Sequence, residues 1–275
     1  MRRLAIIGAG GIADIVVTTL IQELRAPLEH VSILVPTQFV DQARTLLDRG
    51  GDKLAVSRTV HTDVGALLAS KPDVVAECAS HVAVRDYGPP ILESGCDLVV
   101  ISIGSLSDDG LRTRLEQAAA KGGSRVVLPA GAIGGIDALV AARLSGLESV
   151  VYTGRKPPKA WRGTPAETLL DLDGLKEPAV FFEGHARKAA QDYPFNANVA
   201  ATLALAGIGF EQTQVRLIAD PGVTRNVHEF AVRSACSDFT MKLEGRPSAL
   251  NPKTSMMAGY SMARELLNRA GTVVI

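Results

Sequence analysis

A short glycine-rich stretch near the N-terminus places the strongest constraint on what this chain can fold into. Residues 4–13 are Leu-Ala-Ile-Ile-Gly-Ala-Gly-Gly-Ile-Ala. The apolar run before the glycines suits a parallel strand buried on both faces, and Ile12–Leu24 is apolar enough to form a helix. A strand, a glycine turn and a helix in this order favour a dinucleotide-binding site. The alternative is a tight turn that binds no ligand.

Each small residue of the turn has a distinct use in the dinucleotide interpretation. Gly8 permits the tight turn, Gly10 leaves room for a pyrophosphate against bare backbone, and Ala13 lets helix and strand pack closely. The helix N-terminus offers free N–H groups and a positive dipole end to the phosphates. The predicted cofactor-binding residues of this turn are Gly8, Gly10, Gly11, Ile12 and Ala13.

The second predicted strand, 31–35, bears on the choice of cofactor. An acidic residue at its end would bind the ribose 2′-hydroxyl of NAD, whereas an Arg would favour the 2′-phosphate of NADP. The chain continues as Pro36-Thr37-Gln38, and Arg44 is equally well explained as a solvated helix residue. We therefore expect either NAD or NADP to be used.

Strands and helices alternate from Leu4 to Leu128, the pattern of an open, doubly wound parallel sheet. Asp63 is expected to cap a helix, Gly122-Gly123 to end one, and Pro89-Pro90 to interrupt one. The further strands are predicted at 54–56, 72–78, 97–101 and 125–128, and the further helices at 41–48, 64–69, 82–94 and 108–121.

His81 follows the predicted strand 72–78. Ligands of a doubly wound sheet bind beyond the carboxyl ends of its strands, so His81 is a candidate cofactor contact. A His that merely caps the next helix explains the position equally well.

The second half of the chain changes character. Residues 150–153 predict a strand that leads into a basic loop at 155–161, and residues 184–191 predict a helix. Residues 227–233 and 239–243 alternate polar and apolar side chains, as a half-exposed antiparallel sheet does. We expect a Rossmann-like dinucleotide-binding domain at 1–132 and an α/β catalytic and dimerisation domain with a mostly antiparallel or mixed sheet at 133–253. The helical stretch 254–275 is expected to pack back on the first domain.

Composition excludes several classes of protein. The 275 residues carry 29 Lys and Arg and 29 Asp and Glu, so nothing indicates a nucleic-acid partner. The three cysteines lie far apart without a CxxC pair, which favours reduced thiols in a cytoplasmic protein and no metal site. No apolar stretch of about 20 residues occurs, so no membrane span is expected.

Three polar runs in the second half, at 184–198, 220–228 and 251–255, are candidates for substrate chemistry. Asn196 and Asn198 precede a predicted helix, where capping accounts for only one of them. Arg155, Lys253 and Thr254 are candidates to bind carboxylates, although a solvated polar face is the alternative. His228 lies in a predicted strand, where a lone His is more often structural.

The chain resembles the L-aspartate dehydrogenase family over nearly its whole length, and NANVAA together with NPKTS makes the resemblance specific. The matching segments are GAGGIA (8–13), GAIGG (131–135), YTGRKPP (152–158), GTPAE (163–167), FFEG (181–184), NANVAA (196–201), LALAGIG (203–209), ADP (219–221), NVH (226–228) and NPKTS (251–255). The resemblance implies NAD(P)-dependent oxidation of L-aspartate to iminoaspartate. It also implies cofactor contacts at Ala132 and Asn198, a catalytic His228, and a homodimer.

Iminoaspartate would hydrolyse to oxaloacetate and ammonia or supply quinolinate and NAD biosynthesis, and the reverse reaction would be reductive amination. One alternative is another two-domain NAD(P)-dependent reductase, similar to dihydrodipicolinate reductase. A second alternative is a non-catalytic nucleotide-sensing protein.

Overall fold

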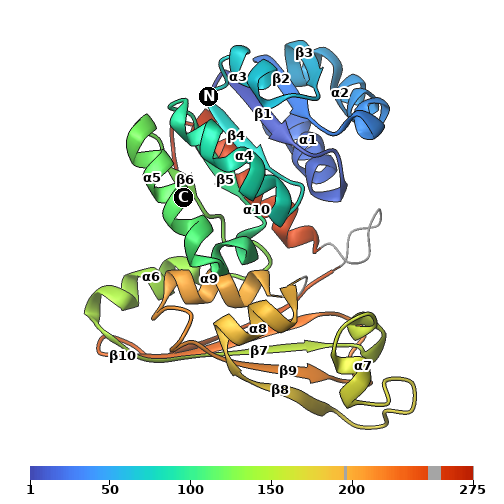
Figure 1. Cartoon of the computed structure of the whole chain (residues 1–275), viewed down its shortest axis with the longest axis vertical. Helices are drawn as coiled ribbons and strands as arrows, with labels where there is room; N and C mark the ends of the chain where they lie inside the picture. Colours follow the sequence, from blue (N-terminus) through green and yellow to red (C-terminus); the bar gives the residue numbers. More distant parts are fainter. Residues whose placement is uncertain (195–196, 247–254, 275) are drawn as a thin grey trace. The chain divides into compact units, whose positions relative to one another are not determined.

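The computed structural model describes residues 1–194, 197–246 and 255–274 of the chain. These residues form two compact units, each with its own sheet (Figure 1). Unit 1 comprises Met1–Pro129 and Ala258–Ile275, and unit 2 comprises Ala130–Met257.

Unit 1 is built on a parallel sheet in which the described strands follow the order β3-β2-β1-β4-β5-β6. The strand order reverses between β1 and β4, which makes their carboxyl ends the expected place for a ligand. The strands are β1 (Arg3–Ile7), β2 (Leu28–Leu34), β3 (Ala55–His61), β4 (Val74–Glu77), β5 (Asp97–Val100) and β6 (Val126–Val127). The α-helices are α1 (Gly11–Glu23), α2 (Val40–Leu54), α3 (Val64–Ala69), α4 (His81–Glu93), α5 (Asp109–Gly122) and α10 (Met256–Ala270), with 3₁₀ turns η1 (Thr37–Phe39) and η2 (Ile103–Ser107).

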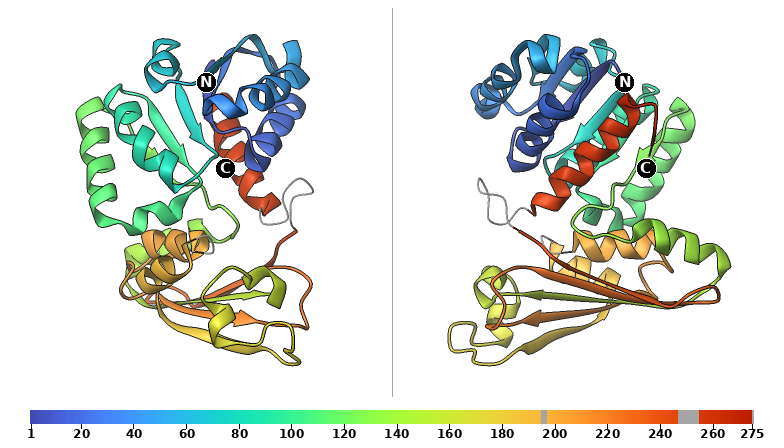
Figure 2. Two further views of the ribbon diagram at one scale, coloured as in Figure 1. Left: turned by 45° about the vertical axis from the view of Figure 1, so that its right-hand side comes forward. Right: turned by 180° about the vertical axis from the view of Figure 1, so that it is seen from behind.

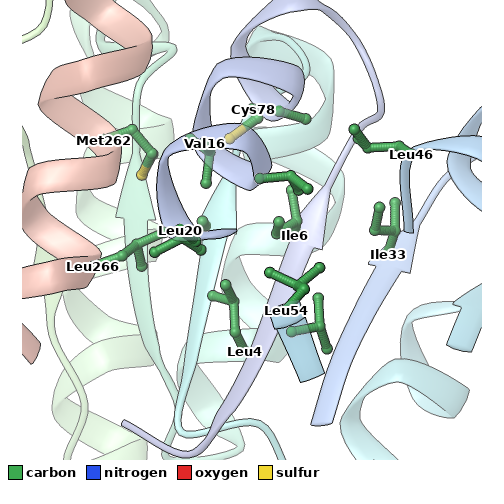
Figure 3. Close-up of a cluster of buried hydrophobic side chains, with 14 of the residues drawn as sticks. Leu4, Ile6, Val16, Leu20, Ile33, Leu46, Leu54, Cys78, Met262 and Leu266 are labelled. Atoms are coloured by element: carbon green, nitrogen blue, oxygen red, sulfur yellow. The ribbon is translucent and has the colours of Figure 1, made fainter. Parts of the chain in front are cut away.

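Helix α10, although last in the chain, contributes to the core of unit 1 (Figure 2). Its side chains Met262 and Leu266 join a buried cluster with Leu20 of α1 and Leu4 of β1 (Figure 3). Gly259 allows close packing, since a Cβ there would lie 2.8 Å from the Cβ of Ile15. Helix α10 is therefore part of the hydrophobic core of unit 1.

The predicted helix signals of unit 1 are largely confirmed. Asp63 accepts a hydrogen bond from the Ala66 N–H at 2.9 Å and caps α3, which spans Val64–Ala69 as expected. Asp108 caps α5 in the same way, and Gly123 ends α5 in the left-handed region with φ of +67°. These signals are local and could be recognised without knowledge of the tertiary structure.

Two predictions for unit 1 are wrong. Helix α4 runs through Pro89 and Pro90 without interruption. Residues on both sides of the prolines, including Val84, Ile91 and Leu92, are buried in the core of unit 1, so tertiary packing holds the helix together where the local signal predicts a break. Strand β3 is longer than the predicted 54–56, because its exposed residues still pair with β2 up to His61.

Unit 2 has a mixed sheet in which the described strands follow the order β11-β10-β7-β9-β8. Only the pairing of β7 with β9 is parallel among these described strands. The strands are β7 (Leu147–Lys156), β8 (Ala179–His185), β9 (Gln214–Ala219), β10 (Val227–Ser234) and β11 (Phe239–Glu244). The helices are α6 (Ile136–Ser145), α7 (Ala166–Leu169), α8 (Ala186–Asp192) and α9 (Asn198–Ala206), with the 3₁₀ turn η3 (Pro158–Trp161).

Helices α6, α8 and α9 cover one face of this sheet (Figures 1 and 2), which we call the inner face. The opposite, outer face carries exposed side chains such as Val151 and Glu229. Alternation along β10 thus puts His228 inward and Glu229 outward. The expected mostly antiparallel or mixed sheet is confirmed.

Two boundaries in unit 2 differ from the sequence prediction. Arg155 and Lys156 continue strand β7, where a loop was expected after Thr153. Gly184 and His185 end strand β8, where a helix was expected to begin. In both places the strand continues because ladder pairing to β9 extends further than the apolar pattern does.

Candidate functional site

The glycine turn of unit 1 begins at Gly8, whose φ is +97°. A Cβ at this position would lie 3.0 Å from both the Ala79 Cβ and the Cys78 carbonyl oxygen. Gly8 also donates its N–H to the Leu34 carbonyl at 2.9 Å. Backbone conformation and close packing therefore both require glycine here.

The next part of the turn is open. No heavy atom among the described residues lies within 4 Å of where a Cβ would stand on Gly10. Gly10 is also the N-cap of α1 and has no side chain to satisfy the first N–H groups of the helix, at Gly11 and Ile12. Ala13 is fully buried against the sheet. Open space above exposed N–H groups fits the pyrophosphate of a dinucleotide.

Glu77, at the end of β4, joins the two loops that follow β4 and β5. Its carboxylate is fully buried and accepts hydrogen bonds from the Ala79 N–H at 2.8 Å and from the Ser102 N–H and hydroxyl at 3.0 and 2.9 Å. Burial raises the pKa of Glu77, while these hydrogen bonds lower it. Glu77 was given no role from the sequence. The available signal was an acidic residue at the end of an otherwise apolar strand.

His81 is the first residue of α4. The cap of that helix is Ser80, whose hydroxyl accepts a hydrogen bond from the Ala83 N–H at 3.3 Å. The interpretation of His81 as the capping residue is therefore wrong. His81 lies at the carboxyl end of β4, where the sheet order reverses.

The end of β2 carries no acidic side chain. Pro36, Thr37 and Gln38 are exposed there, and Arg44 on α2 forms an ion pair with Asp41 at 3.4 Å. The residues directly after β2 therefore offer no carboxylate to select the ribose 2′-hydroxyl, and the Asp41 carboxylate lies further along, paired with Arg44.

In unit 2, His228 points to the inner face of the sheet and is 5% exposed. Its Nδ1 lies 2.8 Å from the hydroxyl of Tyr152 on the neighbouring strand β7, and the two rings are stacked with centroids 6.1 Å apart. This contact holds the imidazole in one orientation and leaves Nε2 as its other polar atom.

Gly154 makes the contact between Tyr152 and His228 possible. In the strand register Gly154 lies opposite His228, while Tyr152 lies opposite Phe230. A Cβ on Gly154 would stand only 2.7 Å from the Tyr152 hydroxyl oxygen. The absent side chain thus gives the tyrosine room to reach the histidine.

Lys156 is the next inward-facing residue of β7 and is 9% exposed. Its ammonium lies 4.9 Å from the ring centre of Trp161, which is itself fully buried. Burial lowers the pKa of Lys156 to about 8. Burial, together with the positive charge of Lys156, lowers the pKa of His228 to about 3.

The pKa values of the cluster Tyr152–Lys156–His228 all shift toward the uncharged form. Burial also raises the pKa of the Tyr152 hydroxyl. A neutral imidazole and a protonated tyrosine therefore stand beside a lysine whose charge is destabilised by burial.

Two residues that the family resemblance linked to the cofactor also lie in unit 2. Asn198 is the first residue of α9, which packs over β7. The N-cap of α9 is Ala197, with no side-chain hydrogen bond, so the capping interpretation of Asn198 is wrong. Ala132 is half-buried in the turn that ends at Gly135, and Gly135 packs near Phe230 and Met241.

Arg155 is not brought together with His228. It faces the outer side of the sheet, where it forms an ion pair with Asp220 at 2.5 Å. The pair lines a charged outer cavity of about 620 Å³ together with Arg225, Glu229, Lys242 and Glu244. The other candidate substrate residues, Asn196, Lys253 and Thr254, lie outside the described residues.

Sequence reasoning missed Tyr152 and Lys156 as members of this cluster. The signal was present: alternate residues Tyr152, Gly154 and Lys156 face the same side once 147–156 is recognised as one strand. In the described residues, no cluster of His, Cys, Asp and Glu could hold a metal ion. Among the helices of those residues, none is long and apolar enough to cross a membrane.

Comparison with known proteins settles the family. A profile described as "Aspartate dehydrogenase, C-terminal" matches residues 137–269, and one described as "Homoserine dehydrogenase, NAD binding domain" matches residues 8–129. L-aspartate dehydrogenase of Polaromonas sp. is 48% identical over the full length of both chains. This chain belongs to the L-aspartate dehydrogenase family.

Other relatives agree with that assignment. L-aspartate dehydrogenase of Pseudomonas aeruginosa is 47% identical, again over the full length of both chains. The crystal structure of aspartate dehydrogenase from Thermotoga maritima matches with a TM-score of 0.74 and 27% identity, covering 100% of this chain and 99% of that one. The resemblance found in the sequence motifs is thus confirmed, and the dihydrodipicolinate-reductase alternative is superseded.

Proposed function

We propose that this chain oxidises L-aspartate to iminoaspartate with NAD or NADP as the hydride acceptor. Family membership supports the reaction, and the buried His228–Tyr152 pair beside Lys156 is the observation that carries it. This cluster places a neutral imidazole, which can accept a proton, beside a lysine, which can bind a carboxylate in its ammonium form.

The cofactor's pyrophosphate would be held at Gly8, Gly10, Gly11, Ile12 and Ala13. The open space over Gly10 and the uncapped N-terminus of α1 support this assignment. We retain His81, Ala132 and Asn198 as further proposed cofactor contacts. When bound, the nicotinamide supplies a site that accepts the hydride from the substrate α-carbon.

His228 would accept the proton that leaves the substrate ammonium group. Acceptance at Nε2 requires that Nδ1 carry the imidazole hydrogen and donate it to the Tyr152 oxygen, 2.8 Å away. The Cα–H bond then breaks with its electron pair leaving as hydride, and the lone pair of the neutral amine forms the C=N bond, so that the first product is the protonated (iminium) form of iminoaspartate. The imine then hydrolyses to oxaloacetate and ammonia or supplies quinolinate and pyridine nucleotide synthesis, and the reverse reaction is reductive amination.

Substrate carboxylates would be held in part by Asn196, Lys253 and Thr254, which the sequence analysis singled out. Arg155 receives less support, because it faces the outer side of the sheet and is paired with Asp220.

Both NAD and NADP should support turnover, since no acidic side chain follows β2. The measurement is kcat/KM for each cofactor at saturating L-aspartate. A preference for NAD above about a thousandfold, or about 4 kcal/mol at 1.4 kcal/mol per decade, would contradict this.

The outer face of the unit 2 sheet is proposed as a homodimer interface in a cytoplasmic enzyme. Val151 and Val180 are exposed there, 40% and 44% respectively, on strands that pair into one continuous surface. The three cysteines form no disulfide, which suits a reducing compartment. Light scattering at micromolar concentration should give the mass of two chains, and a single-chain mass would overturn the interface.

The test of the activity is the formation of reduced cofactor when L-aspartate is added to the purified protein at mildly alkaline pH. We expect turnover with L-aspartate and none with L-lysine or with glycine. Binding of NAD without turnover of any amino acid would favour the nucleotide-sensing alternative.

A further inference from the structure

The inner face of the unit 2 sheet carries a buried lysine, Lys156. Lys156 is the last residue of β7, two positions beyond Gly154 and four beyond Tyr152. Alternation along the strand therefore sends all three residues to the face that carries His228. Arg155, between them, faces the opposite side.

The lysine ammonium is held by its surroundings. It lies over the ring of Trp161 at 4.9 Å, a distance at which a cation is attracted to an aromatic face. Trp161 is fixed in turn, because its ring N–H donates to the Ile218 carbonyl at 3.1 Å and its edge packs on Phe181. The strand and the tryptophan thus restrict where the ammonium can lie.

Lys156 is a near neighbour of His228 on the inner face, because Gly154 lies opposite His228 in the strand register and Lys156 is two positions further along β7. The positive charge of Lys156 contributes, after burial, to the lowered pKa of His228. A carboxylate that arrives beside both groups would stabilise the ammonium and offset its effect on the imidazole. The same anion would therefore be bound by Lys156 and would make His228 a stronger proton acceptor.

We propose that Lys156 binds a carboxylate group of the amino dicarboxylate substrate and so places the substrate beside His228. This inference rests on the proposed function, because it assumes that L-aspartate is turned over. The sequence suggested Arg155 as the residue that binds the substrate carboxylate. We assign this role to Lys156 instead, which follows Arg155 on β7 and faces the opposite side of the sheet.

Lys156→Met is the decisive variant, because methionine keeps most of the side-chain length and removes the charge. Without the ammonium, the substrate carboxylate loses a charge-assisted hydrogen bond. We therefore expect the KM for L-aspartate to rise at least about tenfold, or 1.4 kcal/mol, with a smaller change in kcat. The cofactor dissociation constant should stay within about twofold of the wild-type value, far less than the tenfold change expected for KM.

Two companion variants separate binding from structure. Lys159→Met removes an exposed lysine only three residues away and should leave KM unchanged. Lys156→Arg keeps the charge and should recover part of the affinity that Lys156→Met loses. Melting temperatures are recorded for all three.

L-asparagine, used as a competitive inhibitor, identifies the carboxylate. If Lys156→Met weakens the binding of L-aspartate alone, Lys156 binds the side-chain carboxylate. If it weakens the binding of both ligands equally, Lys156 binds the α-carboxylate, which both ligands carry. Either result supports the proposal.

Three results would overturn it. The first is a folded Lys156→Met enzyme with wild-type KM, and the second is a loss of kcat with KM unchanged, which would assign Lys156 to proton transfer. The third is loss of folding in both the Met and Arg variants, which would assign it to the fold. Failure of the wild-type protein to oxidise L-aspartate is a separate outcome that refutes the proposed function instead.

Discussion

The glycine turn of unit 1 and the inner face of unit 2 present two different kinds of site. The turn offers backbone N–H groups from consecutive residues, with open space above Gly10. The inner face offers side chains from two strands, Tyr152 and Lys156 from β7 and His228 from β10, separated by more than 70 positions. A backbone site is thus specified by local sequence, whereas a side-chain site depends on strand register.

The two sites also differ in electrostatics. Residues 8–13 carry no charged side chain, and Asp14 in the first turn of α1 is paired with Arg49 at 2.7 Å, so an anion would be met by the helix dipole and by N–H groups. The inner face instead buries titratable groups, and the pKa shifts of Lys156 and His228, to about 8 and about 3, both oppose positive charge. This difference indicates that the first site is suited to a cofactor's phosphates and the second to a substrate that brings its own negative charge.

Substitutions in the turn should break the first site without affecting the second. Gly10→Val should raise the NAD dissociation constant at least about tenfold, because its side chain would fill the space over the N–H groups and remove about 1.5–3 kcal/mol of charge-assisted hydrogen bonding. Folding stability should fall by at most about 1 kcal/mol, the usual cost of losing a favourable N-cap. Titration of NAD, with urea unfolding on the same sample, measures both.

Gly8→Val is the matched contrast to Gly10→Val. Its side chain would meet Ala79 and the Cys78 carbonyl at a φ that valine rarely adopts, so the free energy of unfolding should fall by about 3 kcal/mol or more. Equal stability of the two variants would show that the turn is not divided between a packing role and a binding role.

Tyr152→Phe tests whether the Tyr152 hydroxyl positions His228 in the second site. The change removes one hydroxyl and leaves His228 without its partner on Nδ1, so the ring can adopt either tautomer and orientation. We expect kcat on L-aspartate to fall about tenfold, near 1.4 kcal/mol, with the NAD dissociation constant unchanged. Wild-type kcat in this variant would mean that the imidazole is positioned by other contacts.

The remaining prediction concerns the dependence of folding stability on pH. His228 has a pKa of about 3 when folded and the usual value of about 6.5 when unfolded, so below pH 6.5 the unfolded state binds more protons. Its contribution to stability is unchanged above pH 6.5 and falls by about 2 kcal/mol by pH 5.

The check is urea unfolding at pH 7 and pH 5, followed by the fluorescence of Trp161, the chain's one tryptophan, which lies in unit 2. His228→Gln serves as the control, because it removes this titration and leaves the other histidines in place. Parallel losses of stability in wild type and His228→Gln would contradict the lowered pKa.

The sequence was sufficient for features that depend on neighbouring residues. The turn at Gly8, the cap at Asp63 and the end of α5 at Gly123 each follow from local geometry, and the structure confirms them. The interruption expected at Pro89 was wrong because α4 is packed into the core through residues on both sides of the prolines, and tertiary packing overrides the local signal there.

The second site could be predicted only in part. His228 was identified through family motifs, but its partner Tyr152 depends on the register of β7 against β10 and on the missing side chain of Gly154. A single boundary error had a large consequence: ending the strand at Thr153 hid the alternation that sends Arg155 and Lys156 to opposite faces. Both residues are cationic, so their charge alone could not show which of them faces His228.

The division of labour between the two sites is tested most directly by His228→Ala, with kcat, NAD dissociation constant and melting temperature measured on one preparation. We predict that kcat on L-aspartate falls at least about a hundredfold, near 2.7 kcal/mol of barrier. We also predict that NAD affinity and melting temperature stay close to wild type, because the glycine turn is untouched. A well-folded variant with wild-type kcat would contradict the account, as would a parallel loss of NAD affinity and folding that leaves turnover per folded molecule unchanged.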